Sequence, residues 1–320
     1  DAGPEIVLKT RKLSEIKPQR VKFLWPGRIP EGKFTMGTGL PDQGKSLFAL
    51  MLAAYVSNGN QWPDGAENGG AGRVLILAAE DDAADTIAPR LANFGADLSK
   101  IEIIDATFFE DKPDKQRPFM LDSTGVEALA SHAERNETKL LIIDTISHFF
   151  AADLNKAQEC KQALKPLVQY AARYEASIFA IEHMGKSRDR DPLGRVMGST
   201  GLAGQARYVW GFAKDPNDPD RIRMVRLKGN LSRCTGGLAF RCESVPDSDH
   251  PKVTWEPQPC MDSPWDVFCP PKISPREEKL DDAIDHLRSE LRFGPLFANE
   301  VYETGAQNGL SKRTLQKAGK

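Results

Sequence analysis

The chain has 320 residues, of which 40% are hydrophobic and 28% charged, as is typical of a globular protein with one sizeable core and a small appendage. Its formal net charge of −2 excludes nucleic-acid binding through the overall field, so any such contact needs a local basic patch. No apolar stretch approaches the about 20 residues of a membrane span, which argues against a membrane partner. The first residues contain neither a signal-peptide pattern nor a starting Met, so we expect a processed or trimmed piece.

The cysteines indicate a reducing compartment. There are five of them, an odd number, and no two have C-x-x-C spacing. This pattern favours neither a disulfide framework nor a zinc site. We therefore expect a cytoplasmic protein.

The chain begins with an arm, residues 1–22, which is polar with mixed charge and is expected to pack beside the domain that follows. Residues 23–256 then alternate apolar strand-like segments with helical ones. The predicted strands are Phe34–Gly37, Val74–Ala78, Ile101–Ile104, Leu140–Ile143, Ile178–Ile181 and Tyr208–Phe212. The predicted helices are Lys45–Ser57, Asp82–Asn93, Ser123–Arg135 and Ala157–Tyr174.

A complete G-x-x-x-x-G-K-[ST] motif, Gly39-Leu40-Pro41-Asp42-Gln43-Gly44-Lys45-Ser46, lies between the first strand and the first helix. In such a loop, backbone N–H groups and the helix N-terminus bind phosphates, the Lys neutralises the β- and γ-phosphates, and the hydroxyl ligates Mg²⁺. The alternative is a flexible glycine loop without a ligand, which the flanking strand and helix disfavour. The predicted ATP-binding residues are Gly39, Pro41, Asp42, Gln43, Gly44, Lys45, Ser46 and Leu47.

The strand pattern predicts an α/β fold. Val74–Ala78 and Leu140–Ile143 are apolar throughout, as expected for parallel strands covered by helices on both faces. From Arg221 the sequence alternates polar and apolar residues instead. Arg221–Leu227, Leu238–Cys242 and Val253–Glu256 therefore predict antiparallel strands that end the sheet.

The carboxyl-terminal part is expected to be separate. Residues 257–275 are rich in proline and predict a linker. Residues 276–320 contain a helical segment, Glu277–Arg292, followed by Ala298–Thr304, Gly309 and Ser311–Ala318, which have helix-turn-helix spacing. We expect this segment to be an incomplete helix-turn-helix module that binds DNA or a replication partner.

Two acidic residues at strand ends are candidates for the chemistry of hydrolysis. Asp144 ends an apolar strand and is expected to bind Mg²⁺ together with Ser46, whereas the alternative is a turn cap. No Glu follows Asp144 directly, so the residue that activates water must lie elsewhere. Glu80 follows the strand beginning at Val74 and is expected at the same sheet edge. Its alternative role is to charge the start of the next helix, which is the role we expect for Asp81 and Asp82.

His183 follows another strand and could sense the γ-phosphate, although an ordinary core or loop histidine fits as well. The loop after it contains glycine and is basic, which suits binding of DNA backbone phosphates; its alternative role is an ordinary solvated loop. The predicted DNA-binding residues are Lys186, Arg188, Arg190 and Arg195.

A cation from a neighbouring subunit often completes such sites. Arg207 precedes an apolar strand and is a candidate for this arginine finger. Arg226 and Lys228 are rival candidates, and each of the three could be a surface charge.

With these residues placed, the chain resembles the RecA-like P-loop NTPases, in particular the branch of RepA-type hexameric replicative helicases and related phage, plasmid and mobile-element ATPases. The resemblance covers Val21 to Glu243. Its marks are Trp25-Pro26-Gly27, Ala78-Ala79-Glu80-Asp81, Ile142-Ile143-Asp144-Thr145, Glu182-His183, and Gly198-Ser199 through Arg207. Pro41-Asp42 departs from the small residue common in the loop.

The resemblance implies a ring, usually a hexamer, with ATP between subunits and single-stranded DNA in a central channel. Carried over to this chain, Lys45 and Ser46 bind phosphate and Mg²⁺, Glu80 activates water and Asp144 holds the metal. His183 stands at the sensor position, and Arg207 gains over its rivals as the finger.

Three functions follow from these observations. The first is a DNA-stimulated ATPase, most plausibly a replicative helicase. The second is a nucleotide-controlled switch that binds DNA or a protein without motor activity. A kinase built on the same loop is disfavoured, because no second substrate-binding lid is visible in the sequence.

Overall fold

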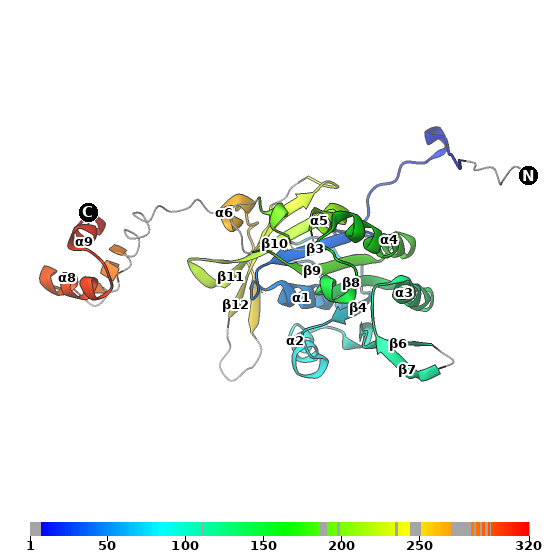
Figure 1. Cartoon of the computed structure of the whole chain (residues 1–320), viewed down its shortest axis with the longest axis horizontal. Helices are drawn as coiled ribbons and strands as arrows, with labels where there is room; N and C mark the ends of the chain where they lie inside the picture. Colours follow the sequence, from blue (N-terminus) through cyan, green and yellow to red (C-terminus); the bar gives the residue numbers. More distant parts are fainter. Residues whose placement is uncertain are drawn as a thin grey trace, which may run out of the picture. The chain divides into compact units, whose positions relative to one another are not determined.

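The computed structural model describes residues 8–109, 112–185, 191–196, 199–233, 236–243 and 251–269, and in the carboxyl-terminal segment 283–284, 286–288, 290–291, 294 and 296–319. The chain divides into two compact units, Asp1–Cys269 and Pro270–Lys320. Figure 1 shows the first as a sheet with helices on both faces and the second as a small group of helices.

The elements follow the alternation expected from the sequence. The strands are β1 (Phe23–Trp25), β2 (Ile29–Pro30), β3 (Phe34–Gly39), β4 (Arg73–Ala78), β5 (Ile101–Ile103), β6 (Ala106–Phe109), β7 (Lys112–Pro118), β8 (Thr138–Asp144), β9 (Ser177–His183), β10 (Tyr208–Asp215), β11 (Asp218–Gly229), β12 (Leu238–Glu243) and β13 (Lys252–Trp255). The α-helices are α1 (Lys45–Asn58), α2 (Ala88–Asn93), α3 (Ser123–Arg135), α4 (Ala157–Tyr174), α5 (Ser199–Gln205), α6 (Pro264–Phe268), α8 (Ala298–Gln307) and α9 (Lys312–Ala318). The short helical turns are η1 (Leu13–Glu15), η2 (Ala83–Ile87), η3 (Leu98–Lys100), η4 (Ile146–Phe149) and η5 (Leu193–Arg195).

Within the described residues, the central sheet has nine strands in the order β13-β12-β11-β10-β3-β9-β8-β4-β5. The pairs from β10 to β5 are parallel, and β11, β12 and β13 continue the sheet in antiparallel pairs. The predicted α/β class and the predicted antiparallel end are therefore confirmed. Because β3, β9, β8 and β4 are parallel and adjacent, their carboxyl ends lie at one edge of the sheet.

Two apolar cores cover the sheet, one on each face. Val74 and Ile76 of β4 belong to the core with α1 and α2, whereas Leu75 and Leu77 belong to the core with α3, α4 and α5. This alternation is the two-residue period of a strand. Since both faces are covered, the strands are apolar along their whole length, as the sequence shows.

A buried cluster fixes the entry to β3. The guanidinium of Arg28 lies 5.5 Å from the ring centroid of Trp25 and 5.6 Å from that of Trp210. Asp64 accepts hydrogen bonds from Arg28 Nε at 2.8 Å and from Trp25 Nε1 at 3.0 Å. These contacts explain why Trp25-Pro26-Gly27 precedes the first strand of the sheet.

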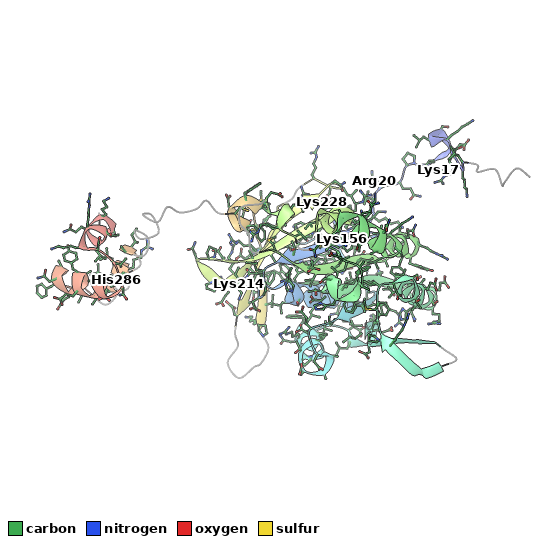
Figure 2. The ribbon with its side chains drawn as sticks, in the orientation of Figure 1. Lys17, Arg20, Lys156, Lys214, Lys228 and His286 are labelled. Carbon is green, nitrogen blue, oxygen red and sulfur yellow. The ribbon has the colours of Figure 1, made fainter. Side chains whose placement is uncertain are left out.

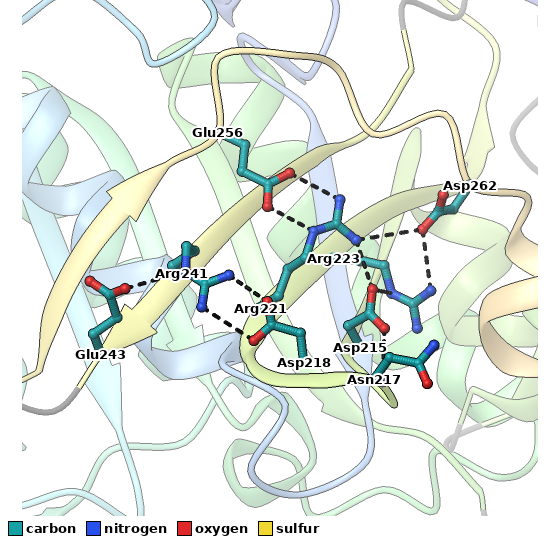
Figure 3. A network of polar contacts seen from close by, with 9 residues as sticks. All are labelled: Asp215, Asn217, Asp218, Arg221, Arg223, Arg241, Glu243, Glu256 and Asp262. Atoms are coloured by element: carbon teal, nitrogen blue, oxygen red, sulfur yellow. Dashed lines mark hydrogen bonds and ion pairs between the residues drawn. The ribbon is translucent and has the colours of Figure 1, made fainter. Parts of the chain in front are cut away.

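The antiparallel end of the sheet is tied together by ion pairs (Figure 3). Arg221 makes two hydrogen bonds to Glu256, at 2.7 and 2.9 Å, and one to Asp215 at 2.9 Å. Hydrogen bonding to Glu256 raises the pKa of Arg221. Arg223 reaches Asp262 at 3.2 Å, and Arg241 pairs with Asp218. The network therefore holds the turn between β10 and β11 against the segments that follow β13.

Two expectations about the ends of the first unit differ from the structure. Residues 8–22 of the arm are exposed and do not pack on the sheet, although Lys22 pairs with Glu175 at 3.1 Å. The division between units falls after Cys269, inside the expected 257–275 linker. Phe268 of α6 is buried beside Met184 and Val225, so the proline-rich sequence there packs on the sheet.

The second unit contains the helices expected from the helix-turn-helix spacing. Leu310 and Leu315 are buried with Ala283, and Leu287 and Tyr302 pack against them. None of the helices in the described residues combines the length and the hydropathy needed to cross a bilayer.

Candidate active site

The phosphate loop connects the end of β3 to the start of α1. Gly44 precedes the helix with φ +77°, and a Cβ there would lie 2.6 Å from Ile222 Cδ1. A Cβ at Gly39 would collide with the carbonyl oxygen of Phe212. Asp42 has φ +57°, a conformation that Asp tolerates better than most residues. The two glycines are therefore required by close packing against β10 and β11.

A side chain of the loop also joins it to the sheet. Gln43 Oε1 accepts a hydrogen bond of 2.6 Å from the backbone N–H of Lys214, near the end of β10. Lys214 is labelled in Figure 2. The loop thus rests on the strand whose turn is held by the Arg221 network.

Lys45 is 5% exposed, and its Nζ donates a 2.8 Å hydrogen bond to the carbonyl oxygen of Leu40. Burial lowers the pKa of Lys45, and the neighbouring Asp144 and Glu80 carboxylates oppose that shift. The ammonium is therefore a poorly hydrated cation held inside the loop. Such a group suits an anionic ligand that lies between the loop and the helix N-terminus.

Asp144 is the last residue of β8, and the peptide bond between Asp144 and Thr145 is cis. Burial raises the pKa of the Asp144 carboxyl, while a hydrogen bond from the Ser46 side chain lowers it. A desolvated carboxylate beside a hydroxyl fits a divalent cation. Among the described residues, no group of three or more His, Cys, Asp or Glu side chains could hold a metal by itself, so Mg²⁺ here would need phosphate oxygens as further ligands.

Glu80 lies just beyond β4, next to the end of β8, because Ala78 pairs with Asp144 in the sheet. Its carboxylate Oε1 lies 3.8 Å from His183 Nε2 and 3.9 Å from His148 Nδ1. Asp82, in contrast, caps the following helical turn by accepting from Ala84 N and Asp85 N. The expected division between Glu80 and Asp82 agrees with this geometry, whereas Asp81 pairs with Arg90 at 3.5 Å.

Sequence reasoning missed His148 and Glu182. His148 lies on η4, directly after β8, and its Nδ1 is 2.5 Å from Thr145 Oγ1. Glu182 is 3% exposed and accepts from the backbone N–H groups of Ser147 at 3.2 Å and His183 at 2.8 Å. It thereby fixes η4 beside β9. A carboxylate inside an otherwise apolar strand was the available signal for Glu182.

A cavity of about 650 Å³ joins these parts. It is lined on one side by the phosphate loop from Pro41 to Leu47, and on another by Glu80, Asp144 and His183. The remaining wall comes from the antiparallel strands and the segments beside them, through Lys214, Pro219, Asp220, Ile222, Cys242 and Pro251. This volume lies in the range of small-molecule sites and exceeds what phosphates alone would need.

Arg207 is not part of this cavity. Its backbone N–H donates to the carbonyl of Phe34 at the start of β3, and β10 runs parallel to β3. At about 3.3 Å per residue, roughly 16 Å of strand separate that point from the phosphate loop. Arg226 and Lys228 pair with this same end of β10. The three candidate finger residues therefore lie at the sheet edge opposite their own nucleotide site.

The basic loop after β9 lies only partly within the described residues, because Lys186, Arg188 and Arg190 fall outside them. Arg195 is described and is 5% exposed. Its guanidinium donates to the carbonyl oxygen of Gly185 at 3.0 and 3.1 Å and to that of Phe268. This burial contradicts a DNA-contacting role for Arg195, whose charge instead holds the loop against α6.

The fold and the site define a RecA-like P-loop NTPase: a mainly parallel sheet with a phosphate loop after one strand and acidic residues at the ends of its neighbours. Residues 4–189 match the AAA_25 family, described as an AAA domain, and the chain belongs to that family. It is therefore an ATPase of the RecA-like type, as the resemblance implied.

Solved structures with a similar arrangement include two with low sequence identity. The first, the ATPase domain of a helicase, is 12% identical, with 66% of this chain and 82% of that chain covered and a TM-score of 0.48. The second, the RadB recombinase crystal structure, is 16% identical, with 67% and 89% covered and a TM-score of 0.47. No curated protein matches the sequence.

Proposed function

We propose that the protein is a ring ATPase that couples ATP hydrolysis to single-stranded DNA, as a replicative helicase of a plasmid, phage or mobile element does. The observation that carries the proposal is Glu80, a carboxylate between two histidines at the rim of a cavity that also contains Lys45, Ser46 and Asp144. A switch that only binds nucleotide does not need such a base.

The residues divide the work of hydrolysis. Lys45 binds the β- and γ-phosphates, and Ser46 and Asp144 hold Mg²⁺, which when bound neutralises charge on the phosphate oxygens. Glu80 accepts a proton from the attacking water, and the nearby His148 and His183 restrict where its carboxylate lies. His183 connects this carboxylate to the basic loop, because the next residue, Met184, donates its N–H to the carbonyl of Gly39 at 3.1 Å.

Arg207 is proposed as the finger that acts on the site of an adjacent subunit, most plausibly in a hexamer. Its position at the far edge of the sheet supports action in trans, because it cannot reach its own phosphate loop. Lys228 is the weaker candidate, since its Nζ donates to the carbonyls of Ala203 and Gly204 at 2.9 and 3.0 Å.

The test is ATP turnover with and without single-stranded DNA, in the wild type and in the Lys186→Ala/Arg188→Ala/Arg190→Ala variant. We expect DNA to stimulate the wild type and the triple variant to lose that stimulation while keeping its basal turnover. Lys161→Ala/Lys165→Ala, on the exposed face of α4, controls for lost positive charge. Turnover that DNA leaves unchanged would favour the nucleotide-controlled switch and reject the motor.

A further inference from the structure

The second unit contains a close crossing of two helices. A Cβ placed on Gly305, in α8, would lie 2.5 Å from Leu315 Cδ1 of α9, so only glycine fits there without displacing Leu315. The turn between the helices contains Gly309 with φ +76°, a conformation that favours glycine. Two helices joined by a short glycine-containing turn form the helix-turn-helix motif.

Further contacts fix α9 on its support. Ser311 caps the helix by accepting from the N–H of Thr314 at 3.2 Å. Lys312 Nζ lies 4.9 Å from the ring centroid of Tyr302 on α8. Thr304 Oγ1 is 3.2 Å from Nε2 of His286, which is labelled in Figure 2. The orientation of α9 is thus set by packing and by polar contacts together.

The outer face of α9 is basic. Leu315 is 2% exposed and faces the crossing, whereas Lys312, Arg313, Gln316 and Lys317 are exposed. These positions follow i, i+1, i+4, i+5 spacing, so they share one side of the helix. No acidic residue occurs between Lys312 and Ala318. On α8, Glu300 accepts from the N–H of Phe297 at 3.1 Å and so caps its own helix.

We propose that this unit is a duplex DNA-binding module that places α9 in the major groove. Its seven residues span about 10 Å at 1.5 Å each, which fits a groove about 12 Å wide. Lys312 and Lys317 contact phosphates, while Arg313 and Gln316 have the side chains that pair with guanine and adenine edges. This site is distinct from the single-stranded DNA loop proposed for the ATPase unit and does not depend on it.

Duplex DNA is the occupant that the observations favour. The face has three cations and an amide, and it lacks the exposed apolar anchor that protein interfaces usually bury at their centre. An acidic protein is the alternative occupant, and the experiment separates the two.

The experiment measures binding of the full chain to a fluorescein-labelled, mixed-sequence DNA duplex by fluorescence anisotropy at about 50 mM salt, where phosphate contacts dominate. The test variant is Arg313→Glu/Lys317→Glu. The matched control is Lys161→Glu/Lys165→Glu on α4, which changes the net charge by the same amount on an exposed helix. Thermal unfolding confirms that each variant is folded.

We expect the test variant to bind the duplex at least about tenfold more weakly, with a salt slope lower by about two contacts, and the control to bind like the wild type. Gly305→Leu, which displaces α9 without changing charge, is expected to weaken binding as well. If the wild type does not bind the duplex, or if the test variant binds as tightly as the control, the proposal is wrong.

Turnover stimulated by single-stranded DNA is measured on the same samples. The test variant is expected to keep that stimulation. Loss of duplex binding with stimulation intact supports the module alone, and a wild type that binds duplex without any stimulation leaves the module standing while rejecting the motor.

Discussion

At the scale of single residues, the position of Glu80 decides whether the protein hydrolyses ATP. The base cannot follow Asp144 in sequence, because Thr145 and Ile146 are buried there. It comes from the neighbouring strand instead, since β4 and β8 are paired in parallel and end side by side. Two strands thus supply separately the metal ligand and the group that activates water.

Glu80→Gln is expected to keep ATP binding and to lower turnover by at least about 100-fold, because the amide cannot accept the proton from water. Phosphate release measures turnover, and a fluorescent ATP analogue measures binding. Asp82→Asn is the control: Asn still caps η2, so its turnover should stay within a few-fold of the wild type. Near-normal turnover of the Glu80 variant would return Glu80 to helix-start charge.

The sequence was sufficient to predict the residues of the phosphate loop, Asp144 and Glu80, because each follows an apolar strand. It was insufficient for Arg195 and His148. Nothing in a run of charges distinguishes a cation that faces water from one that binds carbonyls across a fold, as Arg195 does. His148 enters the site only because Glu182 holds η4 beside β9, a contact between distant segments.

At the scale of elements, α6 shows that proline-rich sequence can be part of a core. Ser263 caps this helix and Pro264 begins it, which is where proline is tolerated. A Cβ on Gly211 would lie 2.5 Å from Phe268 Cε2, so β10 needs a glycine where this ring packs. Residues 257–269 therefore stabilise the ATPase unit.

Phe268→Ala is expected to destabilise the ATPase unit by about 3 kcal/mol, through lost burial and a cavity. All five tryptophans lie before Pro270, so urea unfolding followed by tryptophan fluorescence reports on this unit. Trp265→Ala is the matched control, because Trp265 is 56% exposed on the same helix and should cost within about 0.5 kcal/mol. Equal effects of the two changes would mean that α6 does not support the sheet.

The sequence predicted the long apolar strands and the helices between them well, since burial on both faces leaves an unmistakable pattern. It predicted short elements poorly. The strands β1 and β2 and the hairpin β6–β7 have few residues, so tertiary contacts determine them more than periodicity does.

At the scale of the whole molecule, the positions of Arg207 and the cavity require a second copy if Arg207 acts on a phosphate. Arg207→Ala is expected to lower turnover by about 10³ while ATP binding by the isolated subunit is kept. Parallel measurements of Arg226→Ala and Lys228→Ala decide among the three cations.

Size-exclusion chromatography with an ATP analogue tests the same prediction from the other side. We expect an assembly larger than a monomer, in both the wild type and the Arg207 variant. A strict monomer with full turnover would exclude any action of Arg207 in trans.

Arg195 joins the strand end that carries His183 to the last helix before the second unit. Its guanidinium binds the carbonyls of Gly185 and Phe268 simultaneously, and Met184 is tied to the start of the phosphate loop. A shift of His183 on loss of a phosphate would therefore pull on α6 through one rigid lever. The proposed grip on single strands and the proposed grip on duplex would then share a single mechanical joint, driven by the same hydrolysis event.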